Sequence, residues 1–220
     1  MTGGLAVPPR DSRGSPGHGS VGLGNGGDAQ VPEGPTGDDP RAHDPWPGGA
    51  DLHTHTTASD GTVTPAERVW MAREARLAAV AVTDHDTLAG LAEARAAAAQ
   101  AGIQLIAGVE LGCELQLAGR RVDVHVLGYW VDEGDAPLEE LLQKRRRARQ
   151  ERLVRMLERL AAAGVRVEEE RVRAVAGDAP VGRPHVARVL VEMGLANTVA
   201  EAFERFLVPG RPGYVPRRPL

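Results

Sequence analysis

The pattern of apolar and polar residues changes abruptly near residue 50. Residues 1–49 are dense in Gly, Pro, Asp and Ser, and their few apolar residues follow no period. Such a segment cannot bury enough apolar surface to offset the entropy that ordering would cost, so we predict a disordered tail. Its histidines, His18 and His43, are interpreted as solvated loop residues.

Beyond this tail, short apolar runs alternate with stretches of helical periodicity. One predicted helix begins at a capping box formed by Thr64 and Glu67, with Pro65 in its first position, and an Ala-rich helix ends at Gly102. Strands separated by helices of this length are typical of parallel β-α units, and hence of an α/β fold. Strands are predicted at Ala50–His55, Ala78–Asp86, Ile103–Leu111 and Arg120–Trp130.

The second half of the chain carries a helical pattern. Leucine and methionine recur at helical spacing along Ala136–Gly164, which predicts one long amphipathic helix. Two shorter helices are predicted at Arg183–Gly194 and Thr198–Gly210. Residues 211–220 are rich in Pro and Arg and are interpreted as a connecting loop.

Composition and charge narrow the class of protein. Hydrophobic residues make up 42% of the 220 positions and charged residues 25%, which is ordinary for a globular protein. The net charge of −4 argues against a protein that coats nucleic acid, and no stable DNA complex is expected. No apolar run approaches the roughly 20 residues that span a bilayer, and the N-terminus does not resemble a secretory signal. A single cysteine, Cys113, excludes an internal disulfide framework, so we expect a cytoplasmic protein without membrane association.

The candidate chemistry begins at the first predicted strand. His53 and His55 are separated by one residue, which places both side chains on one face of an extended strand, and Asp60 follows closely. Two imidazoles and a carboxylate are the ligand types of a first-row metal site. The spacing alone is a weak signal, because two polar residues at the end of a strand would look the same.

The later strands repeat these residue types. His85 lies between Asp84 and Asp86, Glu110 is placed at the end of the third strand, and His125 falls on the fourth. Because the carboxyl ends of parallel strands carry the active site in α/β folds, these side chains are expected to converge. Nitrogen and oxygen ligands without cysteine favour Mn, Zn or Fe in a catalytic role over a structural zinc.

Three segments together resemble a known family. DLHTHTTASDG, VAVTDHDT and AGVEL occur in the order and at the spacings of the N-terminal half of a PHP (polymerase and histidinol phosphatase) domain. The likeness runs from Asp51 to about Tyr214 and is nearest to bacterial 3′,5′-nucleoside bisphosphate phosphatases, whose enterobacterial relatives are 5′-3′ exoribonucleases. The resemblance implies the N-terminal part of a distorted (β/α)7 barrel. Residues 50–134 would belong to the barrel and 135–210 to a helical insertion, and 211–220 would return to the barrel.

The resemblance also implies up to three divalent metals, with manganese expected and zinc, iron or magnesium as alternatives. It implies hydrolysis of a phosphate ester of a nucleotide, or of a short RNA, by a metal-activated hydroxide. The matching ligands are His53 and His55 for the first metal, Glu110 as a bridge between two metals, His125 for the second metal, and Asp60 with His85 for the third.

Residues around these ligands carry alternatives. Asp84 or Asp86 is interpreted as the partner that orients His85, although Asp86 could instead cap a helix that starts at Leu88. Arg149 ends the basic run KRRRAR, which faces either solvent or, by the resemblance, the mouth of the metal site. Arg183 and His185 match a family segment that faces substrate, where an arginine would hold a phosphate, or they simply start a helix with Pro184 in first position.

The resemblance stops short of the whole family pattern. A His-Pro element and an Asp-x-His pair, which the family carries later in the barrel, are not found downstream of the helical insertion. We therefore expect either a fragment of a longer gene product or a short chain that a partner completes. Two further functions stay open: a catalytically inactive metal-binding module, and an enzyme of the histidinol-phosphatase type.

Overall fold

A computed structural model describes residues 48–117 and 119–217, and all structural statements concern these residues. They belong to one unit, which comprises residues 43–220. The predicted disordered tail, with His18 and His43, lies outside the described residues except at its last two positions.

The order of elements follows the sequence pattern closely. The strands and helices of the first part are β1 (Ala50–Thr54), α1 (Pro65–Glu74), β2 (Ala79–Val82), α2 (Leu91–Ala101), β3 (Gln104–Leu117) and β4 (Arg120–Tyr129). The second part is helical and consists of α3 (Ala136–Ala162), α4 (Glu169–Ala176), α5 (Arg183–Glu192), α6 (Val199–Ala202) and the short π-helix η1 (Phe203–Leu207).

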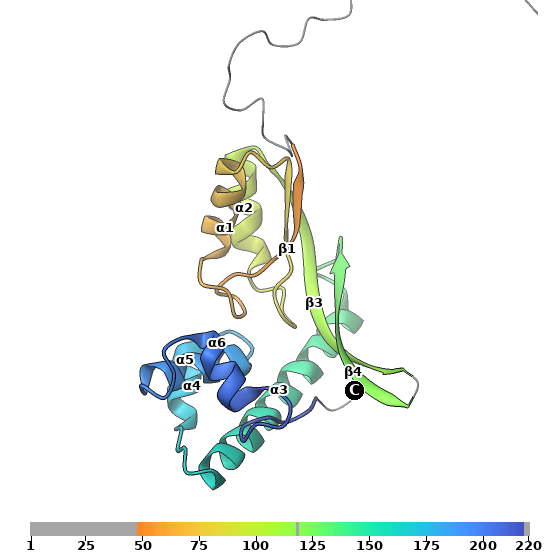
Figure 1. Cartoon of the computed structure of the whole chain (residues 1–220). Coiled ribbons are helices and arrows are strands. Elements are labelled where there is room, and N and C mark those ends of the chain that lie inside the picture. The colour runs from red at the N-terminus through yellow and green to blue at the C-terminus, as the bar shows by residue number, and fades with distance from the viewer. Residues whose placement is uncertain (1–47, 118, 218–220) are drawn as a thin grey trace, which may run out of the picture. The chain divides into compact units, whose positions relative to one another are not determined.

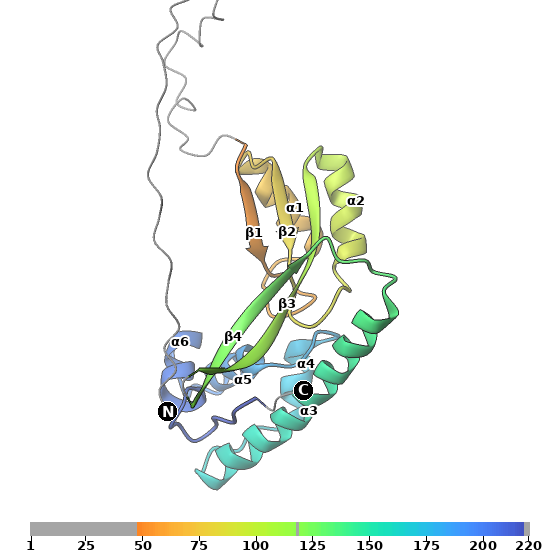
Figure 2. The same ribbon diagram turned by 90° about the vertical axis from the view of Figure 1, so that its right-hand side faces the viewer.

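The strands form one curled sheet in the order β1-β2-β3-β4. β1, β2 and the start of β3, Gln104–Ala107, pair in parallel, whereas the rest of β3 forms a long antiparallel hairpin with β4. Helices α1 and α2 cover one face of the parallel part (Figure 1), and the hairpin extends beyond β1 and β2 toward the helices of the second part (Figure 2). The predicted α/β class and the parallel β-α units are confirmed, and the sheet corresponds to part of a barrel.

Local signals place the helices around the sheet. The Thr64 hydroxyl accepts a hydrogen bond from the backbone N–H of Glu67, and the Glu67 carboxylate accepts one from the backbone N–H of Thr64, so the predicted capping box is confirmed. Helix α2 ends at Gly102, whose φ of 63° lies in the left-handed region that favours glycine. These signals fix where α1 begins and where α2 ends, before the chain enters β3.

Each of the two parts has its own apolar core. The first lies between α1, α2 and the sheet and contains Val69, Val80, Val82 and Leu91. The second lies among the helices of the second part, where Leu153, Met156 and Leu160 of α3 pack against α4, α5 and η1. The long amphipathic helix is thereby confirmed, and none of the described helices is long and apolar enough to cross a membrane.

Among the differences from the sequence predictions, three concern an unpredicted helix and the places of two ligands on their strands. Helix α4 was not predicted. It spans only eight residues, and its buried apolar residues Val172 and Ala176 are too few to show a helical period. β3 continues to Leu117, so Glu110 lies within the strand and not at its end, and His125 likewise lies inside β4, opposite Gly112. Glu110 still lies level with the carboxyl end of β2, beside His85, and the antiparallel register places His125 on the same face of the hairpin as Glu110.

Candidate metal centre

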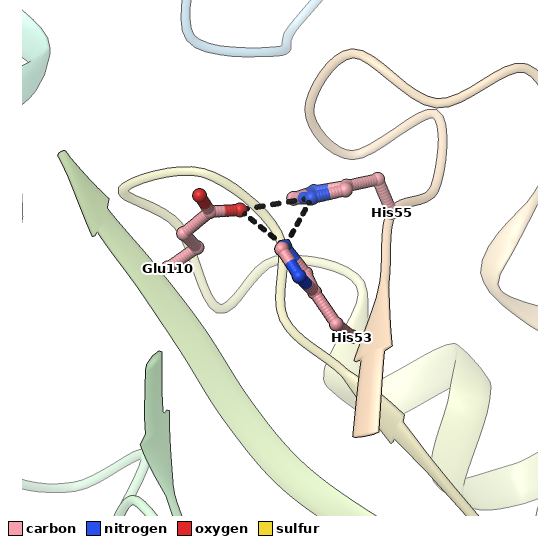
Figure 3. Close-up of side chains that lie close together, drawn as sticks. All are labelled: His53, His55 and Glu110. Atoms are coloured by element: carbon pink, nitrogen blue, oxygen red, sulfur yellow. Dashed lines mark hydrogen bonds and ion pairs between the residues drawn. The ribbon is translucent and has the colours of Figure 1, made fainter. Parts of the chain in front are cut away.

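His53, His55 and Glu110 meet at one point above the sheet. The Nε2 atom of His53 lies 2.8 Å from Oε2 of Glu110, the Nε2 atom of His55 lies 2.9 Å from the same oxygen, and the two Nε2 atoms are 3.2 Å apart. Figure 3 shows the imidazoles of His53 and His55 directed at the carboxylate of Glu110 on β3. An irregularity in the pairing of β1 with β2 falls between Asp51 and Thr54, where the strand turns its histidines toward Glu110.

The centre continues on both sides of Glu110. His85 forms a single parallel bridge with Glu110, and its Nδ1 atom lies 3.6 Å from Oε2 of that carboxylate. Its Nε2 atom lies 3.7 Å from Oδ2 of Asp60, and Nδ1 of His55 lies 3.8 Å from Oδ1 of Asp60. Nδ1 of His125 contacts Oε1 of Glu110. The six predicted ligands therefore form three overlapping groups, His53–His55–Glu110, His55–Asp60–His85 and His85–Glu110–His125.

The nitrogen and oxygen atoms of these groups are better placed to coordinate divalent cations than to form hydrogen bonds with one another. Among the described residues, the buried Nδ1 atoms of His55 and His85 have no hydrogen-bond partner. If both Nε2 atoms of His53 and His55 donate to the same carboxylate oxygen, their two protons are crowded together, because the nitrogens are only 3.2 Å apart. Two donors of one cation with bonds of about 2.0–2.2 Å lie about 3–4 Å apart, as the donor pairs do here. The residues present thus fit a metal centre.

The protonation states also suit metal binding. Burial is the main cause that lowers the pKa of His85 to about 4, and the positive charge of Arg149 acts in the same direction. Burial acts to raise the pKa of Glu110, but the hydrogen bond to His53 and the charges of the other histidines more than compensate and lower it. A neutral imidazole and an ionised carboxylate are the forms that bind cations.

Asp84 organises the loop that carries Asp60. Its buried carboxylate accepts hydrogen bonds from the backbone N–H and the hydroxyl of Thr56, at 2.8 and 2.7 Å, and from the hydroxyl of Ser59 at 2.5 Å. These partners belong to the loop after β1, so Asp84 supports Asp60 through that loop. Among the hydrogen bonds of the described residues, none joins Asp84 to His85.

Asp86 faces the helical part. It receives hydrogen bonds from the Nε atoms of Arg145 and Arg149 on α3, and Arg146 donates one to its backbone carbonyl at 3.1 Å. The alternative of a helix cap at Asp86 is wrong, because α2 begins at Leu91 with Gly90 at its N-cap. The basic run is likewise not a purely solvated face, since these three arginines point at Asp86.

Four arginines line a cavity of about 210 Å³ that also exposes Asp60, His85 and His125. They are Arg149, Arg152, Arg183 and Arg217. Burial lowers the pKa of Arg152 to about 10, and the neighbouring charges of Arg183 and Arg217 add to this effect. Like charges so close together indicate a place for an anion.

Two of these four arginines, Arg152 and Arg217, were not predicted from the sequence. Arg145, Arg149 and Arg152 recur at helical spacing on α3, a signal that periodicity could have revealed, whereas Arg217 lies in the segment interpreted as a loop. The expectation that His185 faces substrate does not fit the structure. Its side chain is 1% exposed, and both ring nitrogens are engaged by the backbone of Gly182 and Ser59.

Comparison with protein-family models and curated sequences places the chain among known proteins. The PHP domain model matches residues 51–174. The chain is 37% identical over 166 residues to the 5′-3′ exoribonuclease Rnm of Escherichia coli, covering 76% of this chain and 56% of that protein. It is 38% identical over 166 residues to a 3′,5′-nucleoside bisphosphate phosphatase of Chromobacterium violaceum, covering 75% of this chain and 57% of that protein.

A solved structure agrees with these matches. A Bifidobacterium adolescentis protein, whose assignment as a metal-dependent phosphoesterase is itself a prediction, is 34% identical and superposes with a TM-score of 0.71. The match covers 78% of this chain and 59% of that one. The chain thus spans a little over half the length of each of these relatives.

Proposed function

The chain belongs to the PHP domain family, and on that basis we propose that it is a metal-dependent phosphoesterase acting on phosphate esters of nucleotides. The observation that carries the proposal is the overlap of three metal-ligand groups with a cavity lined by four arginines. Each group offers three protein donors, which leaves coordination positions for water or a phosphate oxygen, as in catalytic metal sites.

Divalent cations bound here would lower the pKa of water and neutralise charge on a phosphate, with manganese the expected metal. The residues of the chain supply the remaining requirements. Glu110 places a negative charge beside all four histidines, and burial keeps the imidazole of His85 neutral. Arg149, paired with Asp86, keeps its guanidinium beside the cavity, where it would stabilise charge that develops on the phosphate.

For the substrate, we propose a nucleotide with a second phosphate, either a 3′,5′-nucleoside bisphosphate or a short RNA with a 5′-phosphate. Arg183, retained from the sequence interpretation, lies in the cavity with Arg152 and Arg217. Nη2 of Arg152 and Nη1 of Arg217 are buried and find no hydrogen-bond partner within residues 48–117 and 119–217, as expected for donors that await an anion. A second phosphate would satisfy them while the first lies at the metal ligands.

The direct test is phosphate release in the presence of Mn²⁺. We expect hydrolysis of adenosine 3′,5′-bisphosphate, loss of this activity on adding a chelator, and slower hydrolysis of histidinol phosphate, which has one phosphate. Replacing Arg183 with alanine should raise KM for the bisphosphate about 10- to 100-fold, the worth of a charge-assisted hydrogen bond. The same variant should hardly change KM for p-nitrophenyl phosphate, which lacks a second phosphate.

The alternatives give different results in this assay. A chain that binds Mn²⁺ but hydrolyses neither the bisphosphate nor 5′-phosphorylated RNA would be a metal-binding module without catalysis. Preference for histidinol phosphate over the bisphosphate would instead assign the histidinol-phosphatase type.

Gly112 offers a second test of the arginine cavity. A Cβ atom at this position would lie 1.1 Å from Nη1 of Arg217, so Gly112→Ala should displace that flexible side chain from its place 2.9 Å from Nε2 of His125. We expect Gly112→Ala to raise KM for the bisphosphate as much as Arg217→Ala does, and the double variant to be no worse than either. Steady-state kinetics of the three variants measures this.

Gly128→Ala is the matched control for this prediction. It adds a Cβ to a glycine of the same hairpin, where the nearest atoms lie at 3.5 Å or more, an ordinary contact distance. An equal rise in KM in this control would show that any added methyl group on the hairpin disturbs binding, and would contradict a specific role of Arg217.

A further inference from the structure

The loop between β1 and α1 is held by a helix that lies far away in the sequence. Residues 56–61 of this loop carry Asp60, and helix α5 contacts them through His185 and Arg188. The contacts join residues separated by 126 to 128 positions. His185 and Arg188 themselves belong neither to the three ligand groups nor to the lining of the arginine cavity.

His185 makes its contact with a defined tautomer. The backbone N–H of Gly182 lies 3.1 Å from Nδ1, which must therefore be the unprotonated nitrogen. The proton is on Nε2, which donates to the carbonyl of Ser59 at 3.2 Å. The ring is buried, so these two bonds fix the start of α5 directly against the residue that precedes Asp60.

Arg188 lies one turn further along the same helix. Its Nη2 atom donates to the carbonyl of Asp60 at 2.5 Å and lies 3.3 Å from the carbonyl of Gly61. The loop is tight at this point, since a Cβ atom on Gly61 would lie 2.5 Å from the carbonyl oxygen of His55. The guanidinium thus holds the backbone of the metal ligand itself.

A second set of contacts to this loop comes from Asp84, in the segment that follows β2. Asp84 accepts the hydrogen bonds of Thr56 and Ser59, and the N–H of Gly61 donates to the carbonyl of Thr56 at 2.9 Å. Asp60 is therefore held between Asp84 and helix α5. The hydrogen bonds accepted by Asp84 do not involve the carbonyls of residues 59, 60 and 61, which are bound from α5.

We propose that His185 and Arg188 are positioning residues that hold Asp60 within the group His55–Asp60–His85, so that docking of α5 determines the affinity of this metal position. The inference rests on the proposed metal centre. Arg183, at the start of the same helix, lines the cavity. Helix α5 therefore connects the proposed phosphate site with one of the three metal positions.

The test is Mn²⁺ binding by the 220-residue chain, measured by titration calorimetry and by electron paramagnetic resonance of free Mn²⁺. Arg188→Met removes the donors but keeps the aliphatic stem. We expect it to weaken one class of Mn²⁺ sites about 10- to 100-fold, the usual effect of losing a group that supports a ligand, and to leave the other classes unchanged. Arg188→Lys, which keeps one charged donor, should restore part of this affinity.

A double-mutant cycle separates positioning from general damage. Asp60→Asn weakens the same class of sites, and in that background Arg188→Met should cause less than a twofold further loss. Arg171→Met is the matched control, because Arg171 donates to Glu192 at the other end of α5 at 3.2 Å and does not contact the loop. Its Mn²⁺ affinities should equal those of the wild type.

Several results would overturn the inference. Unchanged affinities in Arg188→Met would do so, as would a full additional loss in the Asp60→Asn background. If Arg188→Met does not fold, judged by far-UV circular dichroism, Arg188→Lys and His185→Gln carry the same comparison, and unchanged affinities in both would be equally decisive. A wild-type chain that binds no Mn²⁺ would contradict the metal centre itself, a failure distinguishable from that of the positioning role.

Discussion

Replacing Glu110 with glutamine is expected to remove nearly all Mn²⁺ binding at the centre and to lower phosphate release at least about 10³-fold. The side chain is 1% exposed, and its two oxygens face all four histidines. It belongs to two of the three ligand groups, so one substitution removes a charged donor from both. A loss of 10³-fold corresponds to about 4 kcal/mol of transition-state stabilisation, which is within the reach of metal catalysis.

Glutamine is the informative replacement because it keeps the size of the side chain and can still accept a hydrogen bond. The amount of Mn²⁺ bound in a titration and the rate of phosphate release should therefore fall, while the far-UV circular dichroism spectrum stays unchanged. Glu114→Gln serves as the control, since Glu114 lies on the same strand and outside the three ligand groups of the described residues. Retention of wild-type Mn²⁺ stoichiometry in Glu110→Gln would refute the proposed bridging position of this carboxylate.

Replacing Asp86 with asparagine is expected to cost the largest amount of stability, about 3–5 kcal/mol in the free energy of unfolding. The Asp86 side chain is 2% exposed and pairs with Arg145 and Arg149, whose side chains are 12% and 18% exposed. Burial alone would raise the pKa of Asp86, but the two arginines lower it, so the carboxylate is ionised in the folded protein. Without it, two largely buried guanidinium groups lose their counter-charge.

Asparagine isolates the charge from the backbone effect. The φ of Asp86 is 54°, in the left-handed region, which asparagine adopts about as readily as aspartate does. Urea-induced unfolding monitored by circular dichroism measures the change. Glu139→Gln is the matched control, because Glu139 pairs with Arg146 at 2.7 Å but is 46% exposed, and exposed pairs contribute about 0–1 kcal/mol. A loss below about 1 kcal/mol in Asp86→Asn would contradict the importance of this ion pair.

The local pattern of the sequence determined most of the secondary structure. The capping box at Thr64, the stop at Gly102 and the apolar runs of β2 and β3 act within a few residues, so they are readable without the fold. The same holds for the parallel arrangement, since two strands joined by a helix have few other ways to pair. The candidate ligands were also readable as residue types, because six residues of the metal-binding kinds cluster along four strands and their loops.

The tertiary structure decided what these side chains contact. His125 reaches Glu110 because the register of the hairpin makes them diagonal neighbours on one face, and Arg217 reaches His125 across 92 positions. His185 and Arg183 stand two residues apart on α5, yet the first is buried against a loop and the second lines the cavity. The surroundings that each side chain meets depend on how the helices dock on the sheet. This docking is a result of long-range packing, which no local period encodes. Sequence therefore determined the elements and the residue types of the centre, whereas packing between distant segments decided which residues act together.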